Sequence, residues 1–312
     1  MVEWTRDALF KKAAGYSKRA MGQDRSGPWF PYWAILSLEF LARAALAKVS
    51  PALLADPRNE DSLMFAFGKA TGSPPSVVTS KVIERCTRLV DGFTSEHLKV
   101  CTRLFGLRNA ELHSGASPYE GLSVQAWLPD YFSVCKVLLA HLEVAMESYF
   151  GKDDADAAAK MIDAASAQAR KEVLDRVAAC RKAFGALDQV QQVAKAAAAA
   201  MKLRDILSSG NTRKSENCPA CGTRAMVNGD FIDHSEPRLD GKDLVYDINV
   251  LPGELECFAC GLRVVGHREM HAIEMGGQYT ITQYDDPVEY FGIEASDFYE
   301  PDPTDYDYDD GR

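Results

Sequence analysis

Two short cysteine motifs constrain the C-terminal part of this 312-residue chain more than any other feature. CPACG contains Cys218 and Cys221, and CFACG contains Cys257 and Cys260. Each motif places two thiols on a tight turn, and the glycine after the second cysteine lets the backbone fold under a bound metal ion. Two such turns complete a tetrahedral four-thiolate site of the kind that Zn²⁺ occupies. Because four thiolates leave no open coordination position, we expect a structural zinc ion rather than a catalytic one.

Thirty-five residues separate Cys221 from Cys257, which is longer than the common spacing. We expect the intervening DFIDHSEPRLDGKD to form a loop between strands. A redox-active C-x-x-C motif and a set of unrelated thiols are the alternatives, but two pairs that are each followed by glycine favour the metal site. His234, His267 and His271 lie nearby in the sequence, and none of them is needed to complete the set of ligands.

The other four cysteines are scattered singly, which favours a reducing compartment over a disulfide framework. The N-terminal sequence lacks the basic start, apolar middle and small-residue cleavage site of a signal peptide. The most apolar segment, WAILSLEFLARAALA, carries Glu39 and Arg43, which argues against a membrane span. We therefore expect a cytoplasmic protein with no membrane partner. The single cysteines are Cys86, Cys101, Cys135 and Cys180.

Residues 1–150 have the pattern of helices with short breaks, and no segment alternates convincingly with the period of a strand. Thr5 can cap the first helix, the break GQDRSGPWFP follows it, and Pro51 stops the second helix. Five such helices predict an all-α domain. The expected helices run from Thr5 to about Met21, from the break to about Val49, onward from about Ser76, onward from Ser95, and from about Asp130 to Phe150.

Residues 151–210 are rich in alanine and are expected to form a helical connector. Apolar residues step through this segment by four and three positions, as in a heptad stripe. A long helical hairpin that packs on its own domain and a dimerising coiled coil both fit the stripe. The hairpin is favoured, because the stripe covers only about two heptads. Its members are Val173, Val177, Cys180, Phe184 and Leu187.

Residues 211–284 change character, because TRAMVNG, LVYDINVL and ELECF alternate or are rich in strand-forming residues. We expect a small β-rich zinc-ribbon domain here, after the polar hinge SSGNTRKSEN. The fold class predicted for the whole chain is therefore mainly α, with an N-terminal helical bundle, a helical connector and a small β-rich zinc ribbon at the C-terminus.

Residues 285–312 form an acidic, proline-interrupted tail that we expect to be disordered. The tail holds eleven of the 45 acidic residues and one of the 35 basic residues, so 34 of each remain in the rest of the chain. The net charge of −10 therefore belongs to the tail, and an acidic partner such as RNA is compatible with the rest. Both an inert solubility tail and an electrostatic mimic of RNA fit this composition.

The stretch LRNAELHSG combines an arginine, an asparagine and a histidine near the end of the fourth predicted helix. On a helical wheel, Arg108 falls inside the apolar arc of this helix, while Asn109 and His113 fall on its border, one turn apart. A buried guanidinium needs a carboxylate, a phosphate or a partner subunit. Glu39 is an available carboxylate, in which case Arg108 forms an internal ion pair and His113 is an ordinary capping residue.

An arginine, a polar residue and a histidine four to six positions after the arginine, on a late helix of an all-α domain, resemble the signature of HEPN-domain ribonucleases. Here these residues are Arg108, Asn109 and His113. Upstream, Trp4 with DALFKKAAGYSKRA, and PWFPYW leading into LSLEFLARAALAKVSPALLAD, resemble the first two helices of that family, including the segment around Glu39. The resemblance covers about residues 1–150.

The resemblance implies a homodimer in which two such helices build one composite, metal-independent site that cleaves RNA. His113 would act as general acid or base on the ribose 2′-hydroxyl or the leaving oxygen. Arg108 would hold the phosphate, and Asn109 would orient the histidine or a phosphate oxygen. HEPN toxins regulated by modification of a tyrosine two residues after the histidine differ from this chain, which has Gly115 at that position.

We therefore expect an RNA endonuclease, as a bacterial defence or toxin-like effector that a protein or nucleic-acid trigger activates. The alternatives are a non-catalytic HEPN-like scaffold whose zinc ribbon binds nucleic acid or protein, and a transcription-related adaptor whose acidic tail binds a basic partner. Intact Arg108 and His113 favour the enzyme. Arg108 held against Glu39, far from a second copy of the chain, would favour the scaffold.

Overall fold

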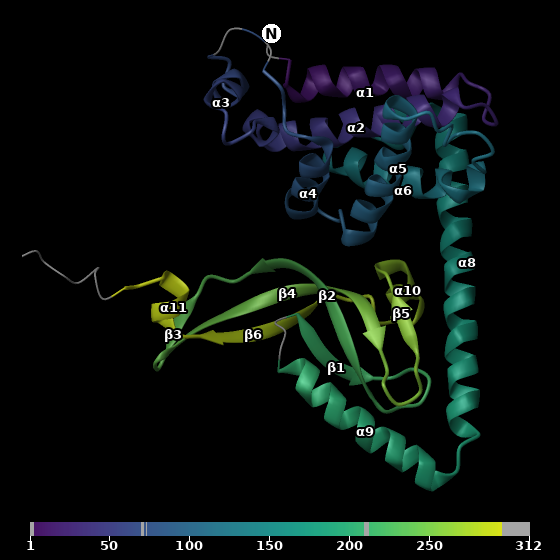
Figure 1. The fold of residues 1–312 in the computed structure, drawn as a ribbon, viewed down its shortest axis with the longest axis vertical. Coiled ribbons are helices and arrows are strands. Elements are labelled where there is room, and N and C mark those ends of the chain that lie inside the picture. Colours follow the sequence, from purple (N-terminus) through teal and green to yellow (C-terminus); the bar gives the residue numbers. More distant parts are fainter. Residues whose placement is uncertain (1–2, 70–71, 73, 209–211, 295–312) are drawn as a thin grey trace, which may run out of the picture. The chain divides into compact units, whose positions relative to one another are not determined.

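The computed structural model describes residues 3–69, 72, 74–208 and 212–294 (Figure 1). The chain forms two compact units. The first unit comprises Met1–Arg176 and Gly266–Ile273, and the second comprises Val177–Val265 and Glu274–Arg312. The boundary between them crosses one long helix, and a short segment from the C-terminal half of the sequence belongs to the first unit.

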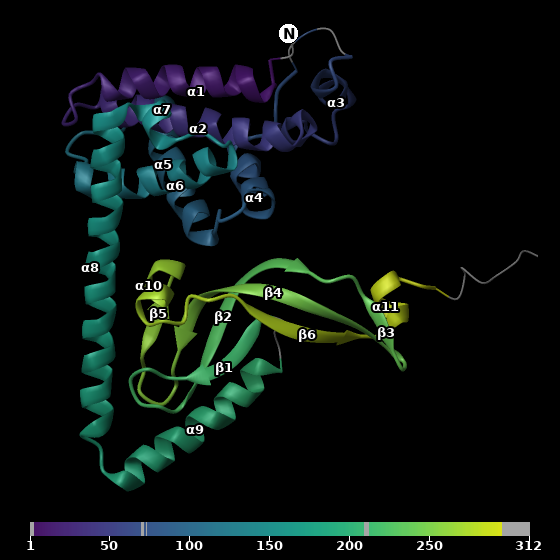
Figure 2. The ribbon, with the colours of Figure 1, turned by 180° about the vertical axis from the view of Figure 1, so that it is seen from behind.

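Two long helices, α1 (Arg6–Met21) and α2 (Trp29–Val49), pack against each other in the first unit (Figures 1 and 2). The Thr5 hydroxyl accepts a hydrogen bond from the Ala8 amide at 3.3 Å and caps α1. The second helix ends at Ser50, immediately before Pro51. The start of α1 and the ends of both helices confirm the boundaries expected from capping and breaker residues.

Helix α2 is the centre of the first unit and packs against α1, α4, α5 and α6. Among the described residues, it is the one helix long and apolar enough to cross a membrane, and 78% of its most apolar window is buried inside the structure. That burial is expected of a core helix. The shorter elements around it are η1 (Pro51–Leu54), α3 (Glu60–Ala66), α4 (Thr79–Leu89), α5 (Ser95–His113), η2 (Val124–Ala126), α6 (Leu128–His141) and α7 (Met146–Phe150).

Two details of this unit differ from the prediction. Helix α3 was not expected, although Asn59 caps it by accepting a hydrogen bond from the Ser62 amide at 3.0 Å. The last predicted helix is two helices, α6 and α7, and Glu143 adopts a φ of 60° at the break between them. A left-handed residue of this kind ends a helix locally, and no glycine marks it in the sequence.

Helix α8 (Lys152–Gly185) and helix α9 (Gln189–Leu207) occupy most of the predicted connector. Asp188 and Gln191 form a capping box at the start of α9. Helix α9 packs on strands β1 (Arg213–Asn217) and β2 (Arg224–His234) of the second unit. Val173 and Val177 of the heptad stripe are buried in the single chain, whereas Cys180, Phe184 and Leu187 are half-buried.

The second unit is built on a six-stranded antiparallel sheet around β4 (Figure 1). Strand β4 pairs with β2, β3, β5 and β6, and β1 extends the sheet from β2. Register shifts in β2 lie between Asn228 and Gly229 and between Phe231 and Asp233. The strands are β1 (Arg213–Asn217), β2 (Arg224–His234), β3 (Arg238–Asp240), β4 (Asp243–Glu256), β5 (Arg263–Val265) and β6 (Tyr279–Asp285).

The predicted fold class was wrong for this region. The helical N-terminal region is present, but the sheet is larger than a small zinc ribbon, since β2 has 11 residues and β4 has 14. The segment expected as a loop, DFIDHSEPRLDGKD, instead completes β2 and forms β3. Part of the expected hinge, Arg213–Asn217, is β1. Cross-strand pairing and bulges stabilise these polar strands without the strict alternation that marks a strand in sequence.

Two short helices complete the structure. Helix α10 (His267–Ala272) belongs to the first unit. Helix α11 (Pro287–Phe291) packs on β4 and lies at the start of the segment expected to be disordered. The rest of that predicted tail, residues 295–312, lies outside the described residues.

Candidate functional site

The two cysteine motifs fold into turns with matching backbone hydrogen bonds. In the first turn, the Cys218 amide donates to Thr223 O at 2.8 Å, and the Gly222 amide donates to Cys218 O at 2.9 Å. In the second, the Cys257 and Gly261 amides make the equivalent bonds at 2.9 Å each. The two glycines have φ values of 74° and 77°, which side chains other than glycine rarely adopt. The glycine after each pair is therefore needed for the turn itself.

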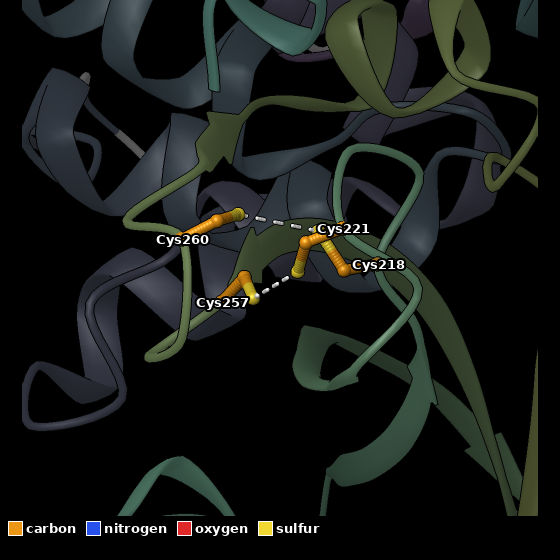
Figure 3. Close-up of side chains that lie close together, drawn as sticks. All are labelled: Cys218, Cys221, Cys257 and Cys260. Carbon is orange, nitrogen blue, oxygen red and sulfur yellow. Dashed lines mark hydrogen bonds between the residues drawn. The ribbon is translucent and has the colours of Figure 1, made fainter. Parts of the chain in front are cut away.

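The turns bring the four thiols together (Figure 3). The sulfurs of Cys218 and Cys260 are 3.6 Å apart, those of Cys221 and Cys257 are 3.5 Å apart, and all four lie within 4.8 Å of one another. Zinc–sulfur bonds of about 2.3 Å in a tetrahedron require sulfurs about 3.8 Å apart. The four cysteines could therefore hold a metal ion such as zinc.

Thr223 also belongs to this cluster and was not predicted from the sequence. Its hydroxyl lies 3.0 Å from the Cys221 sulfur and 3.4 Å from the Cys257 sulfur. Hydrogen bonds from neighbouring groups, the Cys218 thiol first, lower the pKa of the Cys257 thiol, whereas burial raises the pKa of the Cys260 thiol to about 12. Groups that surround metal-binding thiolates orient them and tune their basicity. The position of Thr223 immediately after the CPACG motif was the available signal.

The nearby histidines lie outside this cluster. Among the described residues, the group of potential ligands around the site contains the four cysteines and no histidine. The His234 ring contacts Tyr246, with ring centroids 5.8 Å apart. His267 is buried and His271 is exposed, both on α10. This arrangement is compatible with the expectation that no histidine is needed to complete the four-cysteine site.

A second candidate site lies in the first unit, where α5 crosses α2. Arg108 Nη1 donates to Glu39 Oε2 at 2.6 Å, and the side chains of these residues are only 13% and 10% exposed. The guanidinium carbon of Arg108 also lies 5.9 Å from the centre of the Phe105 ring. The placement of Arg108 inside the apolar arc and the availability of Glu39 are both confirmed.

Glu39 has two further partners. Thr79 Oγ1 donates to Glu39 Oε1 at 2.6 Å, and Arg43 Nη2 lies 3.3 Å from the same oxygen. Arg43 also donates to Ser76 Oγ at 2.8 Å and to Val77 O at 3.2 Å, so its guanidinium is held by several acceptors. Two guanidinium groups around one carboxylate carry a net positive charge. Arg43 was not predicted as a residue of this site, although its position four residues after Glu39 on one helix face was a usable signal.

Arg108 retains unused hydrogen-bonding capacity. Among the described residues, its Nε is buried without a hydrogen-bond partner, and so is the Tyr119 hydroxyl. Burial raises the pKa of Tyr119 above its ordinary value, and the charges of Glu111 and Arg108 also act on it, so the three side chains are near one another. Buried polar groups are rarely left unsatisfied, so the Arg108 Nε and the Tyr119 hydroxyl each have capacity for a further polar partner.

Asn109 and His113 lie beside Arg108 on α5, and both are exposed. Their separation of four residues places them on one face of the helix. In the part of the chain that the structure describes, neither side chain makes a hydrogen bond, so the His113 ring and the Asn109 amide are open to solvent. The helix ends at His113, with Ser114 as its C-terminal cap. The predicted trio is thus one anchored arginine and two accessible polar side chains.

Comparisons with known proteins identify no relative, because no family model, no curated protein and no solved structure matches the chain. No family match supports the HEPN resemblance, which rests on the residues of the motif and the helices around it.

Proposed function

We propose that the chain is a metal-independent RNA endonuclease whose active site lies at the C-terminal end of α5. The observation that carries this proposal is the arrangement of Arg108, Asn109 and His113. The ion pair with Glu39 fixes the position of Arg108. Asn109, the next residue, and His113, one helical turn after Asn109, have solvent-exposed side chains. Catalytic sites need groups held in position by their neighbours, together with a proton-transfer group that substrate can reach.

The chemistry follows from these residue types. A histidine can take the proton of a ribose 2′-hydroxyl while the 2′-oxygen attacks the adjacent phosphorus. The bond from phosphorus to the 5′-oxygen then breaks, and a second proton donor protonates the leaving oxygen. The products carry a 2′,3′-cyclic phosphate and a 5′-hydroxyl. The net positive pair of Arg43 and Arg108 around Glu39 would stabilise the charge that develops on the phosphate.

This mechanism needs two proton-transfer groups, and each chain contributes one His113. We therefore propose a homodimer through the first unit, in which the α5 helices of two copies face each other and one histidine acts as base and the other as acid. Cleavage would occur in the cytoplasm. The setting that the resemblance implies is bacterial defence or a toxin-like effector, held inactive until a protein or nucleic-acid trigger is present.

We further propose that the ion held by Cys218, Cys221, Cys257 and Cys260 is zinc and that it has a structural role. Four thiolate ligands complete its coordination and leave no position for a substrate or a water molecule. The cleavage chemistry is accordingly assigned to α5 and not to the metal centre.

A non-catalytic scaffold is the second candidate, and one observation favours it. Arg108 is already paired with Glu39 inside a single chain, so its burial needs no phosphate to explain it. In that case the first unit would be a helical scaffold, nucleic acid or protein would bind at the region of the four cysteines, and Asn109 and His113 would be ordinary surface residues. The two candidates differ in whether the purified protein cleaves RNA.

The test compares the wild-type protein with His113→Ala and Asn109→Ala on a labelled single-stranded RNA, with EDTA present at a concentration that leaves the thiolate site loaded. We expect cleavage by the wild type, 2′,3′-cyclic phosphate ends, and loss of at least about 100-fold in rate for His113→Ala. His271→Ala, an exposed histidine of α10, is the matched control and should keep full activity.

Three outcomes would contradict the nuclease. These are full activity of His113→Ala, a strict requirement for Mg²⁺, and products that end in a 3′-hydroxyl. A folded wild-type dimer that cleaves no RNA under any of these conditions would establish the scaffold instead.

A further inference from the structure

Five rings form a continuous strip in the second unit, across β2, β4 and α11. We name it the aromatic strip, and its members are Phe231, His234, Tyr246, Tyr290 and Phe291. Successive ring centroids in this order are 6.2, 5.8, 5.6 and 5.1 Å apart. In Figures 1 and 2, α11 lies close to the ends of β3 and β6, so strands and helix together build this surface.

Much of the aromatic strip is open to solvent. Phe231 is 51% exposed, Tyr290 is 38% exposed and Phe291 is 62% exposed. Single exposed apolar side chains are normal on a protein surface, whereas a contiguous group marks a site of interaction. Further exposed apolar residues lie on the elements that form this part of the second unit, namely Ile232 on β2, Leu239 on β3, Tyr284 on β6 and Val288 on α11.

The segments that carry the aromatic strip are strongly acidic. Residues 230–247 and 279–294, which contain the whole strip, include ten Asp or Glu residues and only two basic residues, Arg238 and Lys242. Arg238 lies 3.9 Å from the carboxylate of Asp247. A surface with this excess of negative charge repels the phosphates of RNA, although its rings are of a type that could stack on bases. It attracts positively charged groups.

One carboxylate is fixed within the strip. Tyr246 donates its hydroxyl hydrogen to Asp285 Oδ2 at 2.7 Å, and this bond raises the pKa of Tyr246 to about 12. Asp285 is therefore held beside the Tyr246 ring as a hydrogen-bonded carboxylate. The faces of aromatic rings attract ammonium and guanidinium groups, and an adjacent carboxylate adds an ion pair.

We propose that the aromatic strip is a docking surface for an arginine- or lysine-rich segment of a partner protein. The rings bind the cationic side chains by their faces and the apolar stems by contact, and the acidic residues around them attract the segment. A second copy of this chain does not fit the same requirement, because the 34 basic residues outside residues 285–312 are balanced by 34 acidic ones and the strip itself is acidic. The proposal is independent of the activity assigned to α5.

The test measures binding of a fluorescein-labelled peptide of nine arginines to the full chain by fluorescence polarisation, from low to moderate salt. We expect saturable binding that weakens as salt is added. Tyr290→Ala combined with Phe291→Ala should weaken binding by about tenfold, and Phe231→Ala, which lies on a strand and does not depend on α11, by about threefold. Val190→Ser, at an 80% exposed position of α9, is the control and should leave affinity unchanged.

The acidic residues 295–312 are present in every one of these proteins, so a difference between variants reports on the rings and not on that segment. Unchanged affinity in both ring variants would overturn the proposal, because binding would then be due to charge alone. The proposal is also wrong if the ring variants lower affinity for a labelled single-stranded RNA rather than for the peptide. If the ring variants, without peptide, sediment as smaller species than the wild type, the strip is a self-association surface. That result would also overturn the proposal.

Discussion

The guanidinium of Arg108 on α5 and the carboxylate of Glu39 on α2 form a buried ion pair at 2.6 Å, between residues 69 positions apart in the sequence. This pair connects the helix that carries the candidate catalytic residues to the central helix of the first unit. Asn109 and His113 follow Arg108 on the same helix, so their direction depends on the same contact. Both the fold and the candidate active site therefore rely on Glu39.

Glu39→Gln should destabilise the first unit by about 3–5 kcal/mol, because breaking a buried ion pair leaves uncompensated charge, here on Arg108 and Arg43. Urea unfolding followed by tryptophan fluorescence measures this change, since all four tryptophans belong to the first unit. Glu143→Gln is the matched control. Glu143 pairs with Lys48 at 2.7 Å but its side chain is 81% exposed, so the variant should unfold at the same urea concentration as the wild type. Equal midpoints for all three proteins would show that the buried pair contributes nothing.

The pH dependence of stability should reveal His97. Burial first, and then the charges of His267 and Arg268, lower the pKa of His97 from 6.5 to about 4. The Thr94 amide donates to His97 Nδ1 at 3.0 Å, which requires that nitrogen to be unprotonated. Because the unfolded chain binds the proton more readily, the folded state is penalised as pH falls below about 6.5, and the loss is complete below about 4.

From these two pKa values, the first unit should lose about 2 kcal/mol between pH 7 and pH 5 through His97 alone. His97→Gln keeps a side-chain acceptor for the Thr94 amide and removes the titration. The free energy of unfolding is measured for the wild type and for this variant at pH 7 and at pH 5, and the two proteins are compared at each pH. Titration of carboxylates such as the neighbouring Glu96 contributes equally to both proteins and cancels in the difference. A difference that does not change with pH would contradict the assigned shift.

Most of the N-terminal helices could be predicted because their boundaries are set locally. The Thr5 cap starts one helix and Pro51 ends another, and both effects act within a few residues. The heptad-like spacing of apolar residues indicates the helical connector. The break at Glu143 could not be foreseen, because a left-handed non-glycine residue depends on contacts made after folding. The sheet was underestimated for a related reason. Strand β4 gains its 14 residues by pairing with four other strands, and long-range pairing leaves a weak local pattern.

The candidate sites were predictable to different degrees. The spacing within CPACG and CFACG encodes each turn, and the structure brings the four sulfurs together as expected. The helical wheel placed Arg108 correctly, because burial follows from period alone. The shared role of Arg43 and Thr79 around Glu39, and the position of Thr223 between two cysteines, depend on which helices and turns meet. The periodicity and spacing of residues in the sequence do not show which helices and turns contact one another.

The purified protein should contain about one zinc ion per chain. Cys257→Ser should release it and unfold the second unit, because a structural thiolate site supplies much of the folding free energy of its surroundings. Gly261→Ala should weaken metal retention without removing a ligand, since its φ of 77° is strained for alanine. Cys180→Ser, at a cysteine outside the cluster, should keep the metal.

Metal content by atomic emission and a colorimetric release assay measure these effects. A metal-free protein whose sheet is fully protected from amide exchange would contradict the assignment.

Gly229 lies at a register shift of β2, where the backbone of β4 approaches too closely for any side chain. A Cβ at this position would overlap the carbonyl oxygen of Leu251 and would lie 2.7 Å from Val250 Cγ1. The carbonyl belongs to a paired strand and cannot rotate away as a side chain can, so Gly229→Ala must displace one strand from the other. We expect a loss of at least about 2 kcal/mol in the stability of the second unit, as for overpacking in a core.

Amide hydrogen exchange of β2 and β4 measures the loss locally. Gly277→Ala is the control, because nothing lies within 4 Å of its Cβ, and it should exchange like the wild type. If both variants retain wild-type protection, β2 and β4 do not meet at Gly229 in this register.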